Sequence, residues 1–111
     1  MGDLNKYRQN VQEIIKRYAE SRPLPADIEG QVVFDTARDH YQLINVGWNN
    51  GKWIYGCVLH MDIKNGKVWL QYNGTEDEIA EELIKAGIPE KDIVIGFHTP
   101  YKRKFTKFAT A

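Results

Sequence analysis

Histidine and aspartate side chains lie near several predicted strand ends, and together these residue types suit acid–base chemistry. A histidine that meets a carboxylate can take up and release a proton near neutral pH. We treat six such residues as a candidate polar cluster: Asp35, Asp39, His40, His60, Asp62 and His98. The histidines are far apart in the sequence and show no metal-ligand spacing, such as i and i+4 on a helix. We therefore expect no metal site, and a hydrogen-bonded structural role is the ordinary alternative for each histidine.

The single cysteine, Cys57, is the remaining candidate nucleophile. A Cys–His pair with His60 is disfavoured, because residues three apart on a regular strand project to opposite faces. We interpret Cys57 as a small buried residue, and one cysteine without a disulfide partner suits a reducing cytoplasm. The sequence also lacks a phosphate-binding loop, a dinucleotide-binding glycine motif and a nucleophile elbow. We predict that the protein is not an enzyme; a hydrolase acting through His40 or His60 with an aspartate is the less favoured alternative.

The C-terminal residues 101–111 carry four basic side chains and no acidic one, interleaved with aromatic rings. Cations contact phosphates and rings stack on bases, so this segment is the best candidate for nucleic-acid contact. The candidate residues, for DNA or for a protein partner, are Tyr101, Lys102, Arg103, Lys104, Phe105 and Lys107. The favoured alternative is a terminal segment whose rings pack on the domain while its cations stay in water. Four phosphate contacts alone would give weak, salt-sensitive binding.

The whole chain is electrically balanced, since 15 Lys and Arg offset 15 Asp and Glu. This balance argues against DNA or anionic-membrane binding by the domain as a whole. It hides a segregation of charge, because residues 76–92 hold seven acids against two bases. Helix capping explains the acids at 76–78, so we expect no metal and no cofactor there.

The first predicted element is an amphipathic helix over residues 3–21. Its apolar side chains recur at intervals of three and four, the helical period: Leu4, Tyr7, Val11, Ile14, Ile15 and Tyr18. Asp3 caps the start, and Pro23 and Pro25 end the helix. The spacing also fits a coiled-coil seam, but fewer than three heptads are present, so we expect packing on the chain's own sheet.

A change to the two-residue period of strands follows the helix. Four strands are predicted, at residues 31–34, 41–48, 52–63 and 68–72. Asn-Gly turns separate the last three, and short loops of this kind join antiparallel neighbours. The sequence therefore predicts a four-stranded β-meander. We expect its Trp and Tyr residues to form the core and its rim, with contact to a partner as the alternative.

A second helix and a short terminal strand complete the predicted fold. Thr75 and Glu78 have capping-box spacing, Gly87 fits the left-handed end of a helix, and residues 93–97 form a strand or an extended pass. The fold class is α+β: an N-terminal helix, a four-stranded antiparallel β-meander, a second helix, and a short C-terminal strand, turn and tail. A chain of 111 residues buries one core, so we predict a single domain over 1–111.

The expected compartment is the cytoplasm. No apolar run approaches the ~18 residues of a membrane span, and no apolar signal segment follows the first residues. We therefore expect no membrane association.

In order along the chain, several motifs resemble the XisI family, the fdxN-element excision controlling factors. They are FDTARDHYQL at 34–43, VGW at 46–48, YGCVLHMDIK at 55–64, GKVW at 66–69, NGTE at 73–76 and GFHTP at 96–100, with Arg103 in the tail. The resemblance covers nearly the whole chain and implies an XisI-like fold. It also implies a small cyanobacterial protein associated with excision of a DNA element by a separate site-specific recombinase, during differentiation of nitrogen-fixing cells. A neighbouring protein, XisH, is usually required with the family, and no catalytic residues are carried over.

Two functional hypotheses follow from the residues and the resemblance together. In the first, the protein is a non-enzymatic accessory factor that binds an XisH-like protein and thereby controls a DNA rearrangement. In the second, it is a DNA-binding module that uses the basic aromatic tail. A homodimer formed through an exposed sheet face or edge is compatible with both.

Overall fold

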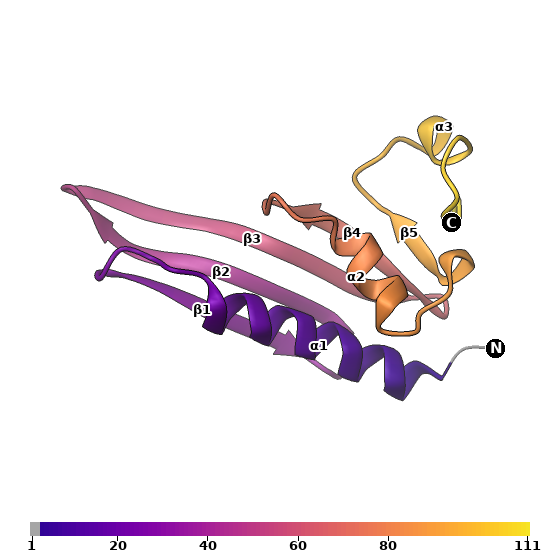
Figure 1. Cartoon of the computed structure of the whole chain (residues 1–111), viewed down its shortest axis with the longest axis horizontal. Helices are drawn as coiled ribbons and strands as arrows, with labels where there is room; N and C mark the ends of the chain where they lie inside the picture. The colour runs from indigo at the N-terminus through magenta and orange to yellow at the C-terminus, as the bar shows by residue number, and fades with distance from the viewer. Residues whose placement is uncertain (1–2) are drawn as a thin grey trace.

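The computed structural model describes residues 3–111, and Figure 1 shows its helices and strands in chain order. Their bounds are α1 Leu4–Ser21, β1 Ile28–Asp35, β2 His40–Asn49, β3 Lys52–Lys64, β4 Lys67–Asn73, α2 Ile79–Lys85, η1 Glu90–Asp92, β5 Ile93–Ile95 and α3 Pro100–Arg103. The predicted α+β class is confirmed, with an N-terminal helix followed by a strand meander. Among residues 3–111, no helix combines the length and the apolar character needed to cross a membrane.

The five strands form one sheet in the order β1-β2-β3-β4-β5. The first four are antiparallel, and their Asn50–Gly51 and Asn65–Gly66 turns have positive φ at both residues, as tight hairpins require. β5 pairs parallel to β4, because the chain first crosses over through α2 before it returns to the sheet. The sequence predicted the meander but left the pairing of this last strand open.

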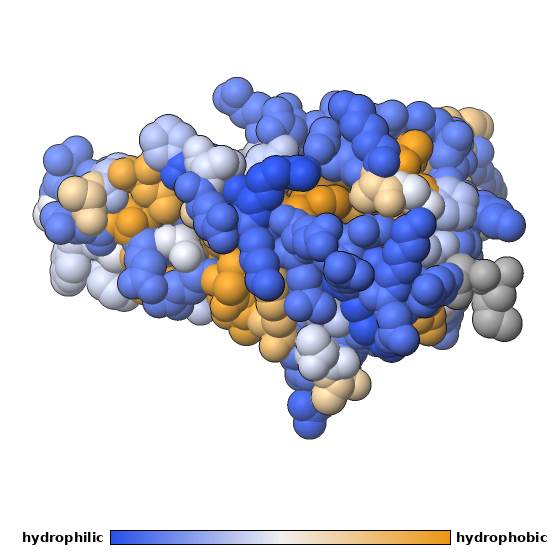
Figure 2. Space-filling view, turned by 60° about the horizontal axis from the view of Figure 1, so that its bottom comes forward, coloured by the Kyte–Doolittle hydropathy of each residue, from blue (hydrophilic) through white to orange (hydrophobic). Residues whose placement is uncertain are grey.

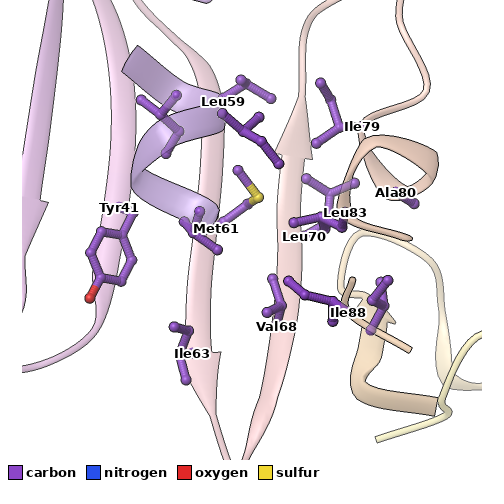
Figure 3. Close-up of a cluster of buried hydrophobic side chains, with 14 of the residues drawn as sticks. Tyr41, Leu59, Met61, Ile63, Val68, Leu70, Ile79, Ala80, Leu83 and Ile88 are labelled. Carbon is purple, nitrogen blue, oxygen red and sulfur yellow. The ribbon is translucent and has the colours of Figure 1, made fainter. Parts of the chain in front are cut away.

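The helices α1 and α2 cover the same face of the sheet, as Figure 1 shows. The apolar stripe of α1 is buried against strand residues, which confirms packing on the chain's own sheet rather than a coiled-coil seam. Figure 3 shows the central part of this core, where α2 meets β3 and β4. Its fully enclosed side chains include Leu59, Met61 and Leu70 from the sheet and Ile79 and Leu83 from α2.

The segment between β4 and α2 differs from the prediction. Glu78 is the N-cap of α2 but makes no capping hydrogen bond through its side chain. The Thr75 hydroxyl instead donates to Asn73 Oδ1 at 2.6 Å and accepts from the N–H of Asp77 at 3.2 Å. The capping-box prediction is wrong because this local turn captures the hydroxyl.

The far end of α2 follows the sequence closely. Gly87 has φ +106°, and the N–H of Ile88 donates to the carbonyl of Leu83 at 3.1 Å. These features form a Schellman motif, so the predicted glycine end of the helix is confirmed.

A hairpin arm formed by β2 and β3, residues 44–57, extends beyond β4 and β5 (Figure 1), and β1 pairs with its β2 side as far as Gly47. β4 pairs only with Leu59–Lys64, so residues 52–57 pair with β2 alone. At the base of the arm Leu43 faces Leu59 while Ile44 faces Cys57, which leaves Val58 as the extra residue of a β-bulge. The arm therefore has a long free strand edge on its β3 side.

The C-terminal segment begins over the sheet face opposite the helices, where Arg103 lies, and then passes the outer edge of β5 to reach α2 through Lys107. The Arg103 guanidinium sits 5.1 Å from the Trp69 ring centroid and donates to the carbonyls of Ile95 and Gly96. Farther along, the N–H of Ala109 donates to the carbonyl of Ile93 at the outer edge of β5. This segment therefore covers β4 and β5 but does not cover the same face of β2 and β3.

Candidate functional site

Three of the six predicted polar residues meet on the sheet face that the helices leave open. Asp62 Oδ1 lies 2.9 Å from His40 Nδ1 and 2.8 Å from His60 Nε2. The register places His40 opposite Asp62, and His60 precedes Asp62 by two residues on β3, so all three project to one side. We call these residues the histidine–aspartate cluster.

Two amide side chains hold this cluster from its edges. Gln71 Nε2 donates to Asp62 Oδ2 at 3.1 Å, and Gln42 Nε2 lies 3.5 Å from His60 Nδ1. A His60 ring protonated on Nε2 donates to Asp62 and presents Nδ1 as the acceptor for Gln42. The exposed fraction is 13% for the Asp62 side chain, 29% for His60 and 55% for His40. The carboxylate is thus enclosed, while the imidazoles reach solvent.

The electrostatics of the cluster keep Asp62 ionised. Burial acts to raise the pKa of its carboxyl, but hydrogen bonds from His40, Gln71 and His60 outweigh burial and hold the pKa below its usual value. Within residues 3–111 the only ion-pair partners of Asp62 are the two histidines. Lys64 lies on the same face of β3, but its Nζ sits over the Trp69 ring, 4.3 Å from the centroid, and does not pair with Asp62.

The predicted residue Asp39 lies outside the cluster and ties α1 to the sheet. Arg8 donates to its two carboxylate oxygens from Nε at 2.8 Å and Nη2 at 3.1 Å, and the Tyr41 hydroxyl donates at 2.9 Å. The hydrogen bond from Arg8 is the largest cause that lowers the pKa of Asp39. The role of Asp39 is therefore structural: it joins a helix, a turn and a strand.

Asp35 and His98 also lie apart from the cluster. Asp35 closes the β1–β2 turn, accepting from the backbone N–H of Arg38 at 3.0 Å and pairing with its guanidinium at 3.2 Å. The His98 and Phe97 ring centroids are 5.0 Å apart, and His98 Nδ1 is buried without a hydrogen-bond partner among residues 3–111. The predicted set of six thus separates into one cluster and three independent residues.

The predicted relation between Cys57 and His60 is wrong, because β3 is not regular between them. The bulge at Val58 makes Cys57 pair with Ile44 and His60 pair with Gln42, two residues on one face of β2. Cys57 and His60 therefore share a face. Burial raises the pKa of the Cys57 thiol, and its Sγ donates to the carbonyl of Leu59 at 3.2 Å, so the thiol is not an activated nucleophile.

The basic residues of the C-terminal segment have two different environments. Arg103 is folded onto Trp69 and backbone carbonyls, and Lys107 Nζ pairs with Glu81 at 2.9 Å. Lys102 and Lys104 form no ion pair within residues 3–111. Only two of the four predicted contact cations are thus available to phosphates.

The predicted aromatic contacts divide in the same way. The Tyr101 and Phe105 rings form an edge-to-face pair with centroids 5.2 Å apart, and both rings are exposed. Phe108 packs against the core instead. The tail therefore presents a small knob of two rings and two lysines.

The hairpin arm carries the aromatic surface that the sequence analysis did not single out. Trp48 and Trp53 form a cross-strand pair with ring centroids 5.3 Å apart, and they are 56% and 54% exposed. Tyr55 is exposed as well, whereas Tyr41 and Trp69 are buried as expected. The predicted strand lengths already indicated this arm. A strand at 52–63 is longer than its hairpin partner at 68–72, so part of it must extend beyond that partner.

The fold and surface place the protein among small α+β domains with two helices on one sheet face and a polar cluster on the other. The sequence model of the XisI family, described as "XisI protein", matches residues 1–110 of this chain. The chain therefore belongs to the XisI family. This finding confirms the resemblance seen in the motifs.

Two solved structures from Anabaena variabilis ATCC 29413 are similar to this chain. A XisI-like protein superposes with a TM-score of 0.94 at 46% identity, covering 98% of this chain and 100% of that one. The fdxN element excision controlling factor XisI superposes with a TM-score of 0.84 at 40% identity, covering 97% and 98% of the two chains. The comparison with curated proteins gave no match.

Proposed function

We propose that the protein is a non-enzymatic accessory factor in the cytoplasm that controls excision of a DNA element by a site-specific recombinase. We propose further that it acts by binding an XisH-like protein through its hairpin arm. Membership of the XisI family, and similarity to a protein described as an excision controlling factor, support the role in excision control. The exposed arm is the observation that carries the binding step.

The free edge of β3 is the first part of this binding surface. β4 leaves the sheet after Asn73, and the last backbone contact on that side is the Gly74 N–H donating to the carbonyl of Val58 at 2.8 Å. Beyond it, residues 52–57 offer backbone groups that β4 does not pair. Such an edge accepts an added strand from another protein. A partner strand would continue the line of β4 along the arm.

Exposed apolar surface is the second part. The Trp48–Trp53 pair and Tyr55 project from the arm, and large rings of this kind form the energetic centre of many interfaces. Figure 2 shows apolar and weakly polar surface at the end of the molecule that the arm occupies. These rings would pack against the side chains of the added strand.

An open pocket beside the edge is the third part. Its volume is about 620 Å³, and it lies between the end of α1, residues 54–58 of the arm and the loop at 74–77. Arg22 and Asp77 line its rim together with Tyr18 and Tyr72. A side chain from the added strand fits this hollow, so backbone pairing and pocket filling would act together.

The experiment is co-expression of this protein with an XisH-like protein, followed by size-exclusion chromatography at micromolar concentration. The proposal predicts that the two proteins elute together as a complex. Separate elution of the two folded proteins overturns it.

Direct DNA contact is a second candidate function, and the exposed knob of the tail is the observation that favours it. Lys102 and Lys104 lie between Tyr101 and Phe105 in the sequence, and Lys104 Nζ is 5.2 Å from the Tyr101 ring centroid, an arrangement that suits phosphate contact with base stacking. Retention of single-stranded DNA at low salt, lost on substitution of both lysines by alanine, is its test.

A further inference from the structure

The donor atoms of the histidine–aspartate cluster suit a metal ion. Nitrogen atoms of His40 and His60 and a carboxylate oxygen of Asp62 all lie within 4.8 Å of one another. Imidazole nitrogen with carboxylate oxygen is a common donor set for zinc and its first-row neighbours. We propose that these three residues bind a divalent transition-metal ion, with Zn²⁺ as the best-fitting ion. This site is independent of the hairpin arm and goes beyond the proposed function.

The local charge favours such an ion. The Asp62 carboxylate is enclosed and ionised, yet its hydrogen-bond partners within residues 3–111 are only an amide and two imidazoles, and the nearby Lys64 sits over the Trp69 ring instead. An enclosed carboxylate without a full positive partner is costly, because hydrogen-bond dipoles replace its hydration only in part. A divalent cation at the shared Oδ1 supplies the missing charge.

The geometry requires only a small adjustment. The present N···O separations of 2.8 and 2.9 Å are shorter than the ~3.3 Å between ligands around a tetrahedral zinc with bonds of ~2.0–2.1 Å. His40 is the most exposed member and stands at the first residue of β2, so its ring is free to open the site. Gln71 continues to hold Asp62 Oδ2 as an outer-shell support.

The protonation states change when a metal binds. His60 would coordinate through Nε2 and carry its proton on Nδ1, which then donates to Gln42 after the amide turns its oxygen toward the ring. The three protein ligands leave one position of a tetrahedron open to water on the solvent-facing side. Because protons compete for the imidazoles, binding weakens as the pH falls.

The test is calorimetric titration of the tag-free full chain with Zn²⁺ at neutral pH. The proposal predicts one ion per chain, and a loss of affinity of about tenfold or more in His40→Ala and in His60→Ala. His98→Ala and Cys57→Ser are matched controls that keep wild-type affinity, because neither residue belongs to the set. A second readout guards against misfolding: Zn²⁺ raises the melting temperature of the wild type and not that of the folded His60→Ala variant.

Two results overturn the proposal. One is the absence of stoichiometric binding at micromolar Zn²⁺, which makes the cluster a purely hydrogen-bonded one. The other is binding that survives His60→Ala and disappears in Cys57→Ser or His98→Ala, which places the ion elsewhere.

Discussion

Asp39 and Asp62 both lie near ends of predicted strands, yet the fold gives the two aspartates different roles. Asp39 pairs with Arg8 of α1, whereas Asp62 meets two imidazoles on the opposite side of the sheet. The pairing with Arg8 depends on how the helix crosses the sheet, and no local motif encodes that crossing. The sequence therefore identified both residues as candidates without separating them.

The cluster itself depends on one extra residue. Continued without a break from the Asn49–Lys52 pair, the register would set His40 opposite Met61. The bulge at Val58 shifts the β2–β3 register by one residue, so that His40 faces Asp62 instead. His60 and Asp62 share a face because side chains alternate along β3. His40 lies on that face only because of the bulge, and no sequence pattern predicts the bulge.

Asp39→Asn is predicted to lower the melting temperature at neutral pH. Its folded-state pKa is held below the unfolded value, chiefly by the Arg8 hydrogen bond. The stabilisation is therefore present above the unfolded pKa and lost as the pH falls through the folded one. Asparagine tolerates the positive φ of 63° at this position, so the change tests the charge and not the turn.

Thermal unfolding of the wild type and Asp39→Asn from neutral to acidic pH measures this effect. The difference in melting temperature should shrink as the pH falls. A difference that stays constant over the whole range contradicts the assignment.

Among the elements, the two helices and the first four strands were predictable because periodicity and Asn-Gly turns are local signals. α1 begins within one residue of its predicted start. β1 extends over Ile28–Asp35, farther than the predicted 31–34, because pairing with β2 orders flanking residues that carry no strand pattern. The parallel pairing of β5 depends on long-range contacts with β4, which periodicity does not report.

Two glycines of the hairpin arm should respond differently to alanine. A Cβ at Gly47, where φ is +152°, would lie 2.0 Å from the carbonyl oxygen of Asp27, whereas a Cβ at Gly56 meets nothing within 4 Å. We predict that Gly47→Ala lowers the free energy of unfolding by about 1–3 kcal/mol or more. Gly56→Ala should leave it unchanged or raise it by about 0.5 kcal/mol.

Urea denaturation of both variants gives the comparison directly. Equal stability of the two variants contradicts the close approach of residue 27 to β2.

The C-terminal segment predicts a specific salt dependence for any DNA binding. Arg103 and Lys107 are engaged within the protein, so Lys102 and Lys104 alone remain for phosphates. The slope of log affinity against log salt should be about −1.4 for single-stranded DNA, from two contacts at −0.7 each. Titrations at several salt concentrations measure it, and a slope near −2.8 would show that all four cations reach the DNA.

At the scale of the whole molecule, the balanced net charge reflects segments of opposite sign that lie close together. Lys107 of the basic tail pairs with Glu81 in the acidic segment 76–92, so part of the cancellation happens inside one chain. The hairpin arm lies outside this region and presents rings rather than charges. This arrangement favours a protein partner at the arm over general attraction to nucleic acid.

Two exposed ring pairs allow a matched test of the proposed partner-binding surface. Trp48–Trp53 lies on the arm and Tyr101–Phe105 on the tail, and both are edge-to-face pairs with similar spacing. Hot-spot aromatic residues cost about 2 kcal/mol or more when truncated at an interface. The double variant Trp48→Ala/Trp53→Ala should therefore weaken the complex strongly, while Tyr101→Ala/Phe105→Ala should not.

The most direct measurement is the dissociation constant of the proposed complex with an XisH-like protein, for the wild type and the two double variants. Circular dichroism first confirms that each variant is folded. We predict that the arm variant binds at least about 30-fold more weakly, the equivalent of ~2 kcal/mol, and that the tail variant binds like the wild type. Equal binding by the arm variant, or loss of binding in the tail variant alone, would contradict the assignment of the arm as the partner surface.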